Sequence, residues 1–512
     1  MPSVIPREKP KSSALIINRI AMPEVYRIFP PLTPPLTTDH WPLPRYTTGM
    51  PTSSTIPSPW RSARHFLVRA LLALLLAAAL WAIWYAYAAH ALARQVAAYQ
   101  AVGDPTTYAE LYRASDPPPS VNAYAVLVDI DAHIKLDSDE MELVESSTSP
   151  TPTYLPLTDA ELRVAERMLA RFSGPLANFE KIRVHPQVVW PMPAKPLDIP
   201  RLGYYRHLAN LRRATALYHH QIGCDDQVLT DLADMHMTAD VCDRGDLLIN
   251  HLVAVAIHTL TNFTLLHIAP DFQVRSSAFP NGAERTQVMA LIDQLGHSDV
   301  MLQGLVDALK GERVYVLTYE RSRSARQPLL VPAHWLAALH DLQNADHRLP
   351  AMRANDYPAF RALLPPETPA TTETFLSQVF DPFGSSFGWD RVGAICFHGL
   401  TDQRAAAIRL ALRLYELDHD RLPPTLEDLT PQYLPKPIAD PMRADGATFR
   451  YDPARRLLYS VGDNRIDDGA TILPPNTSSR FRDPDLVYRL DRPSPAPPAP
   501  APTSSTAPGS AR

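Results

Sequence analysis

Two short patterns in this 512-residue chain contain residue types that catalyse reactions in other proteins. Residues 384–388 read Gly-Ser-Ser-Phe-Gly, which is the G-x-S-x-G spacing of a nucleophile elbow with Ser386 at the nucleophile position. An elbow needs a buried strand that runs directly into the first glycine, but Asp381-Pro382-Phe383 interrupts that approach. We therefore interpret this segment as a loop and keep a hydrolase that uses Ser386 as an alternative.

The second pattern is a pair of histidines, His251 and His258, in the apolar stretch 247–268. They are seven residues apart, so a helix would place both on one face. No Asp or Glu accompanies them on that face, which favours histidines hydrogen bonded in a core over a histidine-bound metal. The stretch is long enough to cross a membrane, but its polar side chains indicate a buried central helix instead. These polar side chains are Asn250, His251, His258, Asn262 and His267.

The element that must position the rest of the chain is the uninterrupted apolar run 70–89. About 20 residues with a rise of 1.5 Å match the ~30 Å hydrocarbon core of a bilayer, and only a helix satisfies its own backbone there. Aromatic residues crowd the second half of the run, as in an interfacial aromatic belt. The sequence therefore predicts one transmembrane helix over residues 66–93, with the lipid bilayer as a partner.

Charge predicts the orientation of this helix. Residues 1–64 carry eight Lys and Arg against three Asp and Glu, whereas the whole chain has a net charge of -5. The positive-inside rule then places the N-terminus in the cytoplasm and the body in the periplasm, with the anchor in a bacterial inner membrane. A cleaved signal peptide with Met50 as its start is the alternative. Because signal peptides have apolar regions of only ~7–15 residues, we favour a retained anchor.

Composition and cysteine count limit the remaining organisation. Proline occurs 53 times and glycine 18 times, and the Pro-rich segments 1–64 and 473–512 lack periodic apolar faces, so we expect both to be disordered. Cys224 and Cys242 flank a predicted helix that would hold them about 25 Å apart, beyond the ~7 Å limit for a disulfide. We predict that these two cysteines and Cys396 are unpaired.

The predicted fold is mainly α, with a mostly helical extracytoplasmic domain over 94–395 and a small α+β domain over 400–472. The strongest helical block joins 202–221 to a second helix starting at Asp225 through a turn at Gly223. This unit resembles the helix-turn-helix of tetratricopeptide repeats, although no fixed period recurs. Other helices are expected at 122–134, from Thr158 through Phe172, at 285–309 and at 405–417, with a β-prone run at 314–318.

Residues 402–469 carry the most specific pattern of the chain. A helix is followed by short turns and by a predicted β-hairpin, 449–451 with 457–461, around Asp452-Pro453. This order resembles the C-terminal globular domain of the major pseudopilins of type II secretion. The matching positions are Pro423, Leu426, Leu429, Tyr433, Leu434, Pro437, Asp440, Pro441, Phe449, Tyr451, Tyr459, Ser460, Gly462 and Asp463.

The chain departs from the pseudopilin pattern in several places. Asp420 and Leu422 replace a Gly and a Tyr, Met442-Arg443 replaces Trp-Gly, and Asn464 replaces the last Gly. Pseudopilins polymerise through an N-terminal helix that follows a Gly cleavage site and carries a Glu at its fifth position. The apolar run here has neither residue and lies far upstream, so the resemblance implies the module without the polymer.

In pseudopilins the acidic loop after the last strand binds calcium. Carried over to this sequence, the resemblance implies Ca²⁺ ligands at Asp463, Asp467 and Asp468, with backbone carbonyls completing an oxygen shell. The alternative is a solvated acidic turn, or Asx-turns that close a hairpin.

These observations favour a non-enzymatic, membrane-anchored scaffold or partner-binding protein associated with secretion or envelope assembly. Its expected partners are the bilayer and other envelope proteins. The sequence does not determine the oligomeric state. The basic stretch 321–326 is interpreted as a solvated face, so nucleic acid is not an expected partner. The alternatives are an envelope hydrolase that uses Ser386 or a histidine-bound metal, and a calcium-dependent structural module.

Overall fold

A computed structural model describes eight segments of the chain, and within them it is mainly helical with one small antiparallel sheet, as predicted. Its contacts divide the chain into two units, Met1–Ala73 and Leu74–Arg512, which are described separately. The described segments are 59–112, 121–146, 156–183, 187–191, 201–245, 247–364, 389–471 and 485–491.

Helix α1 (Pro59–Ala101) provides the described part of the first unit and continues into the second. Every side chain from 63 to 80 is exposed, and the helix is long and apolar enough to cross a membrane over Ala63–Ala101. The prediction of an N-terminal helix with this property is confirmed. Residues 1–58 of the segment predicted to be disordered lie outside the described part, whereas 59–64 are the first turns of this helix.

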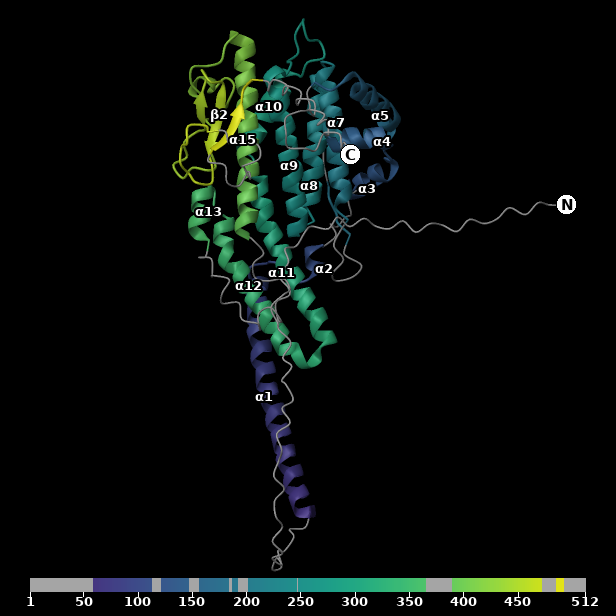
Figure 1. The fold of residues 1–512 in the computed structure, drawn as a ribbon, viewed down its shortest axis with the longest axis vertical. Helices are drawn as coiled ribbons and strands as arrows, with labels where there is room; N and C mark the ends of the chain where they lie inside the picture. The colour runs from purple at the N-terminus through teal and green to yellow at the C-terminus, as the bar shows by residue number, and fades with distance from the viewer. Residues whose placement is uncertain are drawn as a thin grey trace, which may run out of the picture. The chain divides into compact units, whose positions relative to one another are not determined.

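The second unit contains the other helices, and Figure 1 labels most of them. They are α2 (Tyr108–Leu111), α3 (Ala123–His133), α4 (Ser138–Ser146), α5 (Asp159–Ala177), α6 (Glu180–Arg183), α7 (Gly203–Gln221), α8 (Asp225–Asp243), α9 (Leu248–Ile268), α10 (Arg285–His297), α11 (Val300–Arg326), α12 (Val331–Met352), α13 (Tyr357–Leu363) and α15 (Trp389–His419).

Helix α5 begins where the sequence predicts it because of a capping box. The Thr158 hydroxyl accepts a hydrogen bond from the Glu161 backbone N–H at 3.3 Å, and the Glu161 carboxylate accepts one from the Thr158 N–H at 2.7 Å. Met168 and Phe172 then lie one turn apart on the buried face. The local signal and the buried apolar stripe agree, so this helix was predictable.

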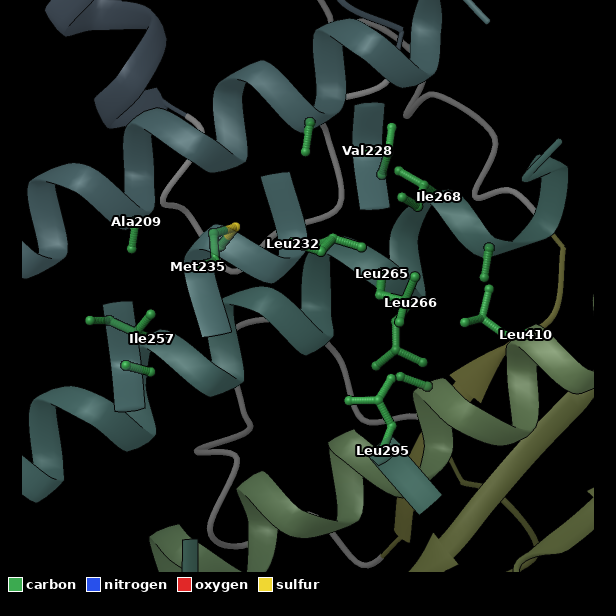
Figure 2. Packing of buried hydrophobic residues seen from close by; sticks show 14 of the residues in the cluster. Ala209, Val228, Leu232, Met235, Ile257, Leu265, Leu266, Ile268, Leu295 and Leu410 are labelled. Carbon is green, nitrogen blue, oxygen red and sulfur yellow. The ribbon is translucent and has the colours of Figure 1, made fainter. Parts of the chain in front are cut away.

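Helices α7, α8 and α9 form the centre of the unit. Apolar residues from these three helices meet residues of α10 and α15 in one core, shown close up in Figure 2. Helix α9 is a central helix with buried Asn250, His251 and Asn262, as predicted. The three cysteines are free, which confirms that prediction.

Buried ion pairs join α7 to α8 across their interface. The Arg212 guanidinium lies 3.0 Å from the Asp231 carboxylate and 2.5 Å from that of Asp234, and Arg183 pairs with Asp234 at 2.7 Å. The His219 imidazole adds a contact of 2.7 Å to Asp231. Since later residues of α8 face earlier residues of α7, the two helices are antiparallel.

Helix α11 corrects two sequence predictions. The β-prone run 314–318 lies inside this helix, where Val314 and Leu317 are buried at a spacing of three residues. Tertiary packing therefore overrides the local β-propensity. The single helix predicted over 285–309 is divided between α10 and α11, because the chain turns at Ser298.

Helix α15 and three strands form the C-terminal part. Strands β1 (Arg450–Asp452), β2 (Leu457–Val461) and β3 (Asp485–Arg489) are antiparallel in the order β1-β2-β3, and β1 and β2 form the predicted hairpin. Strand β3 corrects the prediction of a tail over 473–512, since Leu486 and Tyr488 are buried. Helix α15 also runs across the domain boundary predicted between 395 and 400.

The paired charges between α7 and α8 lead to a stability prediction. Arg212→Leu leaves two nearly inaccessible carboxylates without this cation, and we expect the free energy of unfolding to fall by about 3–5 kcal/mol. Arg167→Leu is the control, because Arg167 is 63% exposed and lies 3.8 Å from Asp139. Denaturant unfolding followed by circular dichroism measures both variants. Equal stability of the two would contradict a structural role for the buried pairs.

Candidate functional site

The acidic loop predicted to bind calcium follows β2. The Asp463 carboxylate lies 2.7 Å from Nε2 of His398, which belongs to α15. Tyr357 of α13 is also close, and its pKa is raised to about 12, mainly by burial and further by the Asp463 charge. Asp463 is therefore directed toward the helices.

The other two predicted ligands have different partners. The Asp467 carboxylate pairs with Arg450 at 3.1 Å and accepts a hydrogen bond from the Tyr459 hydroxyl at 3.2 Å. The Asp468 carboxylate accepts one from the Asn464 side chain at 2.6 Å. Within the described segments, no three His, Cys, Asp or Glu side chains are grouped to hold a metal ion. Calcium binding here stays a prediction, and it would require these side chains to exchange partners.

Asp440 and Ser460, two residues that match the pseudopilin pattern, are brought together. The Ser460 hydroxyl donates to the Asp440 carboxylate at 2.7 Å, and the Met442 N–H donates to the same oxygen at 2.9 Å. Burial raises the pKa of Asp440 to about 6, although these hydrogen bonds oppose the shift. The carboxylate therefore fixes the turn after Pro441 against strand β2.

This turn, α13 and the acidic loop border a polar cleft of about 560 Å³. Its arginines are largely compensated, because Arg443 pairs with Asp445 and Arg450 pairs with Asp467. The described residues that line it include no Ser, Cys or His, so this part of the cleft has no nucleophile next to a base. Its charged side chains suit a polar ligand or a protein surface.

A cysteine, a histidine and an aspartate from three helices meet inside the core. The Cys396 thiol lies 3.3 Å from His251 Nε2, and His251 Nδ1 lies 2.8 Å from the Asp243 carboxylate. This is the order of nucleophile, base and orienting carboxylate found in acyl-transfer enzymes. Burial alone lowers the pKa of His251, but Cys396 and Asp243 outweigh it and raise the pKa to about 10.

The Cys396 thiol and the His251 imidazole are closed off from solvent. Cys396 and His251 are 0% exposed. Helix α11 packs so closely against this group that a Cβ on Gly304 would lie 2.1 Å from the Asp243 carboxylate, so this position requires glycine. Reaction requires a substrate atom within about 3–3.5 Å of the thiol. The described clefts of about 650, 560 and 220 Å³ are lined by other residues. The geometry therefore supports a structural role in the core.

His258 has partners of its own. Its Nδ1 lies 3.1 Å from Nδ1 of His236, and its Nε2 lies 3.4 Å from the Asp240 carboxylate. Burial and the His258 charge lower the pKa of His236 to about 4, so His236 is neutral near pH 7. His251 and His258 are thus core histidines with separate polar partners, as the sequence indicated.

The C-terminal turns of α1 are held to the body by a group of five polar residues, the anchor clamp. The Asp346 carboxylate of α12 accepts hydrogen bonds from Gln95 at 2.6 Å and from the Tyr99 hydroxyl at 2.8 Å. The Arg313 guanidinium of α11 pairs with Asp346 at 2.5 Å and with Asp104 at 2.9 Å, and it lies 4.5 Å from the centre of the Tyr99 ring. Arg313 is only 3% exposed.

Sequence reasoning identified neither the Cys396–His251–Asp243 group nor the anchor clamp. Cys396 is 145 residues from His251, and Tyr99 is 247 residues from Asp346, so no local pattern connects them. Residue Ser386 of the G-x-S-x-G pattern lies outside the described residues.

Comparisons with known protein families, with curated proteins and with solved structures find no match to this chain. The functional proposal therefore depends on the geometry and the sequence alone.

The burial of Cys396 leads to a labelling prediction. In the folded full chain we expect a maleimide to modify the half-buried Cys224, and to modify Cys396 and Cys242 only after denaturation. Mass spectrometry of the digested protein measures each site, and Cys224→Ser is the control for specificity. Rapid modification of Cys396 in the folded chain would instead favour an enzymatic role for the Cys396–His251–Asp243 group.

The acidic loop leads to a calcium prediction. If the loop binds Ca²⁺, millimolar calcium raises the melting temperature of the full chain, because a ligand at about 100 times its Kd adds roughly 2.7 kcal/mol. Chelator should reverse the shift, and Asp467→Asn with Asp468→Asn should abolish it. Asp139→Asn, at an exposed position of α4, is the matched control. An unchanged melting temperature at millimolar calcium would contradict binding.

Proposed function

We propose that this protein is a non-enzymatic, single-pass membrane protein whose extracytoplasmic body acts as a scaffold or partner-binding domain in secretion or envelope assembly. The observation that carries the proposal is the anchor clamp, which joins the body directly to the end of an exposed apolar helix.

The apolar surface of α1 supports insertion in a bilayer. Leu74 is 67% exposed and Leu76 is 62% exposed, and the side chains around them are apolar and exposed as well. Soluble proteins rarely expose continuous apolar patches of this kind, because each buried CH₂ is worth about 0.8 kcal/mol. Lipid is the solvent that suits this surface.

The anchor clamp supports a scaffold role. Arg313 is nearly inaccessible, and removing one partner of a buried charge pair costs about 3–5 kcal/mol, so the contact between the end of α1 and the body is not easily broken. A flexible tether would allow the body to rotate freely above the membrane. A fixed attachment gives the body one orientation, which an assembly factor needs.

The charge distribution supports the orientation. By the positive-inside rule, the excess of Lys and Arg in residues 1–64 favours an N-terminus in the cytoplasm and a body in the periplasm of a bacterial inner membrane. From the sequence resemblances, we infer that the α7–α8 pair is a tetratricopeptide-type hairpin and that α15 with the β1-β2-β3 sheet is a pseudopilin-like domain. We propose these two regions as the surfaces that contact other envelope proteins.

The Cys396–His251–Asp243 group is the observation that favours a second function, an envelope hydrolase. Its distances suit acyl transfer, but the complete burial of Cys396 and His251 does not. The thiol-labelling experiment described above separates the two functions.

Membrane insertion is tested by extraction. We expect the full chain to stay in the membrane pellet after alkaline carbonate, and Leu74→Arg with Leu76→Arg to release it, since each central arginine costs about 2.5–3.5 kcal/mol. Leu363→Arg, at an exposed position of α13, is the matched control and should stay in the pellet. Release of the unmodified chain would contradict the anchor.

The scaffold role is tested by crosslinking cells that produce the full chain before detergent extraction. Recovery of envelope proteins with the full chain, reduced when Arg450 and Arg465 of the polar cleft are changed to Glu, would support partner binding there. Recovery of the chain alone would contradict it. Both changes lie on the surface, so folding is checked by the melting temperature.

A further inference from the structure

The connection between α11 and α12 reaches the part of α1 that contains its aromatic residues. The Trp81 indole N–H donates a hydrogen bond to the Leu329 carbonyl at 2.8 Å, and the Tyr85 and Trp335 rings lie 5.0 Å apart. Leu329 is 76% exposed and Leu330 is 40% exposed. We call residues 321–335 the hairpin tip.

The hairpin tip contacts α1 at Trp81, and this level along the helix conflicts with a membrane span that extends to residue 89. Trp81 would then lie eight residues, or about 12 Å, below the outer edge of the hydrocarbon. Arg321 and Arg326 are exposed residues of the tip and would be carried into the hydrocarbon with it. Charged side chains are strongly disfavoured there.

The conflict disappears if the outer edge of the hydrocarbon lies near Trp81 and Tyr85. Trp and Tyr are enriched at this level of membrane helices, and Trp335 of the body adds a third ring to the same belt. A span of about 20 residues that ends at Tyr85 begins near Phe66. Arg69 would then lie about one turn inside the inner edge, where a long side chain can extend to the headgroups.

We propose that the hairpin tip is a second membrane contact of this protein. Leu329 and Leu330 insert into the outer-leaflet interface, and Arg321 and Arg326 bind the phosphate groups of anionic phospholipids. The proposal rests on the proposed membrane insertion of α1. The bilayer is the occupant that the structure favours, because the Trp81–Leu329 hydrogen bond fixes the two exposed leucines beside the apolar anchor.

The charges of the tip suit phospholipid headgroups. Arg323 is half-buried and pairs with Glu320 at 3.5 Å, so it belongs to the helix pair itself. Arg326 donates to the Ser322 hydroxyl at 3.0 Å and stays exposed, as does Arg321. Guanidinium groups form paired, charge-assisted hydrogen bonds with phosphate oxygens. Basic residues next to apolar ones are typical of interfacial membrane contacts.

The experiment uses the full chain in vesicles of phosphatidylethanolamine and phosphatidylglycerol. Single cysteines for an environment-sensitive fluorophore are introduced in a Cys224→Ser background by L329C at the tip, L76C in α1 and M141C at an exposed position of α4. Lipid-borne nitroxides near the headgroup or deep in the chains quench the fluorophore. We expect stronger quenching by the shallow nitroxide at 329, by the deep nitroxide at 76, and none at 141.

The outcomes separate this proposal from the proposed anchor. Quenching at 76 without quenching at 329 overturns the tip contact and leaves the anchor intact. Absence of quenching at 76 contradicts the anchor itself. Deep rather than shallow quenching at 329 overturns the interfacial position.

The lipid class is tested by charge reversal. Raising the phosphatidylglycerol content should increase quenching at 329 in the parent protein and in the control R421E, whose arginine is exposed elsewhere. With R321E and R326E together we expect tip association to fall about fivefold or more. An equal response of all three proteins overturns the binding of anionic headgroups, and their melting temperatures check the fold.

Discussion

The buried guanidinium of Arg313 is the constraint on which the arrangement of α1, α11 and α12 depends. A cation at 3% exposure needs anionic partners, and the two carboxylates that pair with it come from α12 and from the segment after α1. The three helices must therefore pack together or leave a charge unpaired in the core. Further toward the N-terminus of α1, the Trp81 indole N–H donates to the Leu329 carbonyl of the α11–α12 connection at 2.8 Å, which adds a second polar contact between α1 and this helix pair.

The rest of the second unit depends on a different principle, the pairing of charges inside an apolar core. Asp231, Asp234 and Asp243 of α8 have Arg or His partners on α7, α6 and α9, which offsets part of the cost of burying their charges. Around these pairs the apolar cluster extends from α3 to the residues that follow β3. The core thus accommodates these charged groups because they are paired.

Local signals made part of this structure predictable. The capping box placed the start of α5, the polar residues of α9 indicated burial in protein, and alternation placed β1 and β2. Tertiary packing determined the remaining elements. Val314, Tyr315 and Val316 favour a strand by propensity, but they lie in helix α11 with Val314 facing the core. Strand β3 pairs with β2 after a long gap in sequence. The Cys396–His251 contact has no local signal, because it depends on how α15 passes α9.

Helix α15 has a consequence for how the chain folds as it is made. Its residues lie in the same apolar cluster as those of α7, α8 and α9, although it is synthesised much later. The earlier helices therefore emerge with apolar faces that no partner covers until α15 follows. Completion of the core must wait for the last quarter of the chain, and a chaperone that shields apolar helices would have its binding window in that interval.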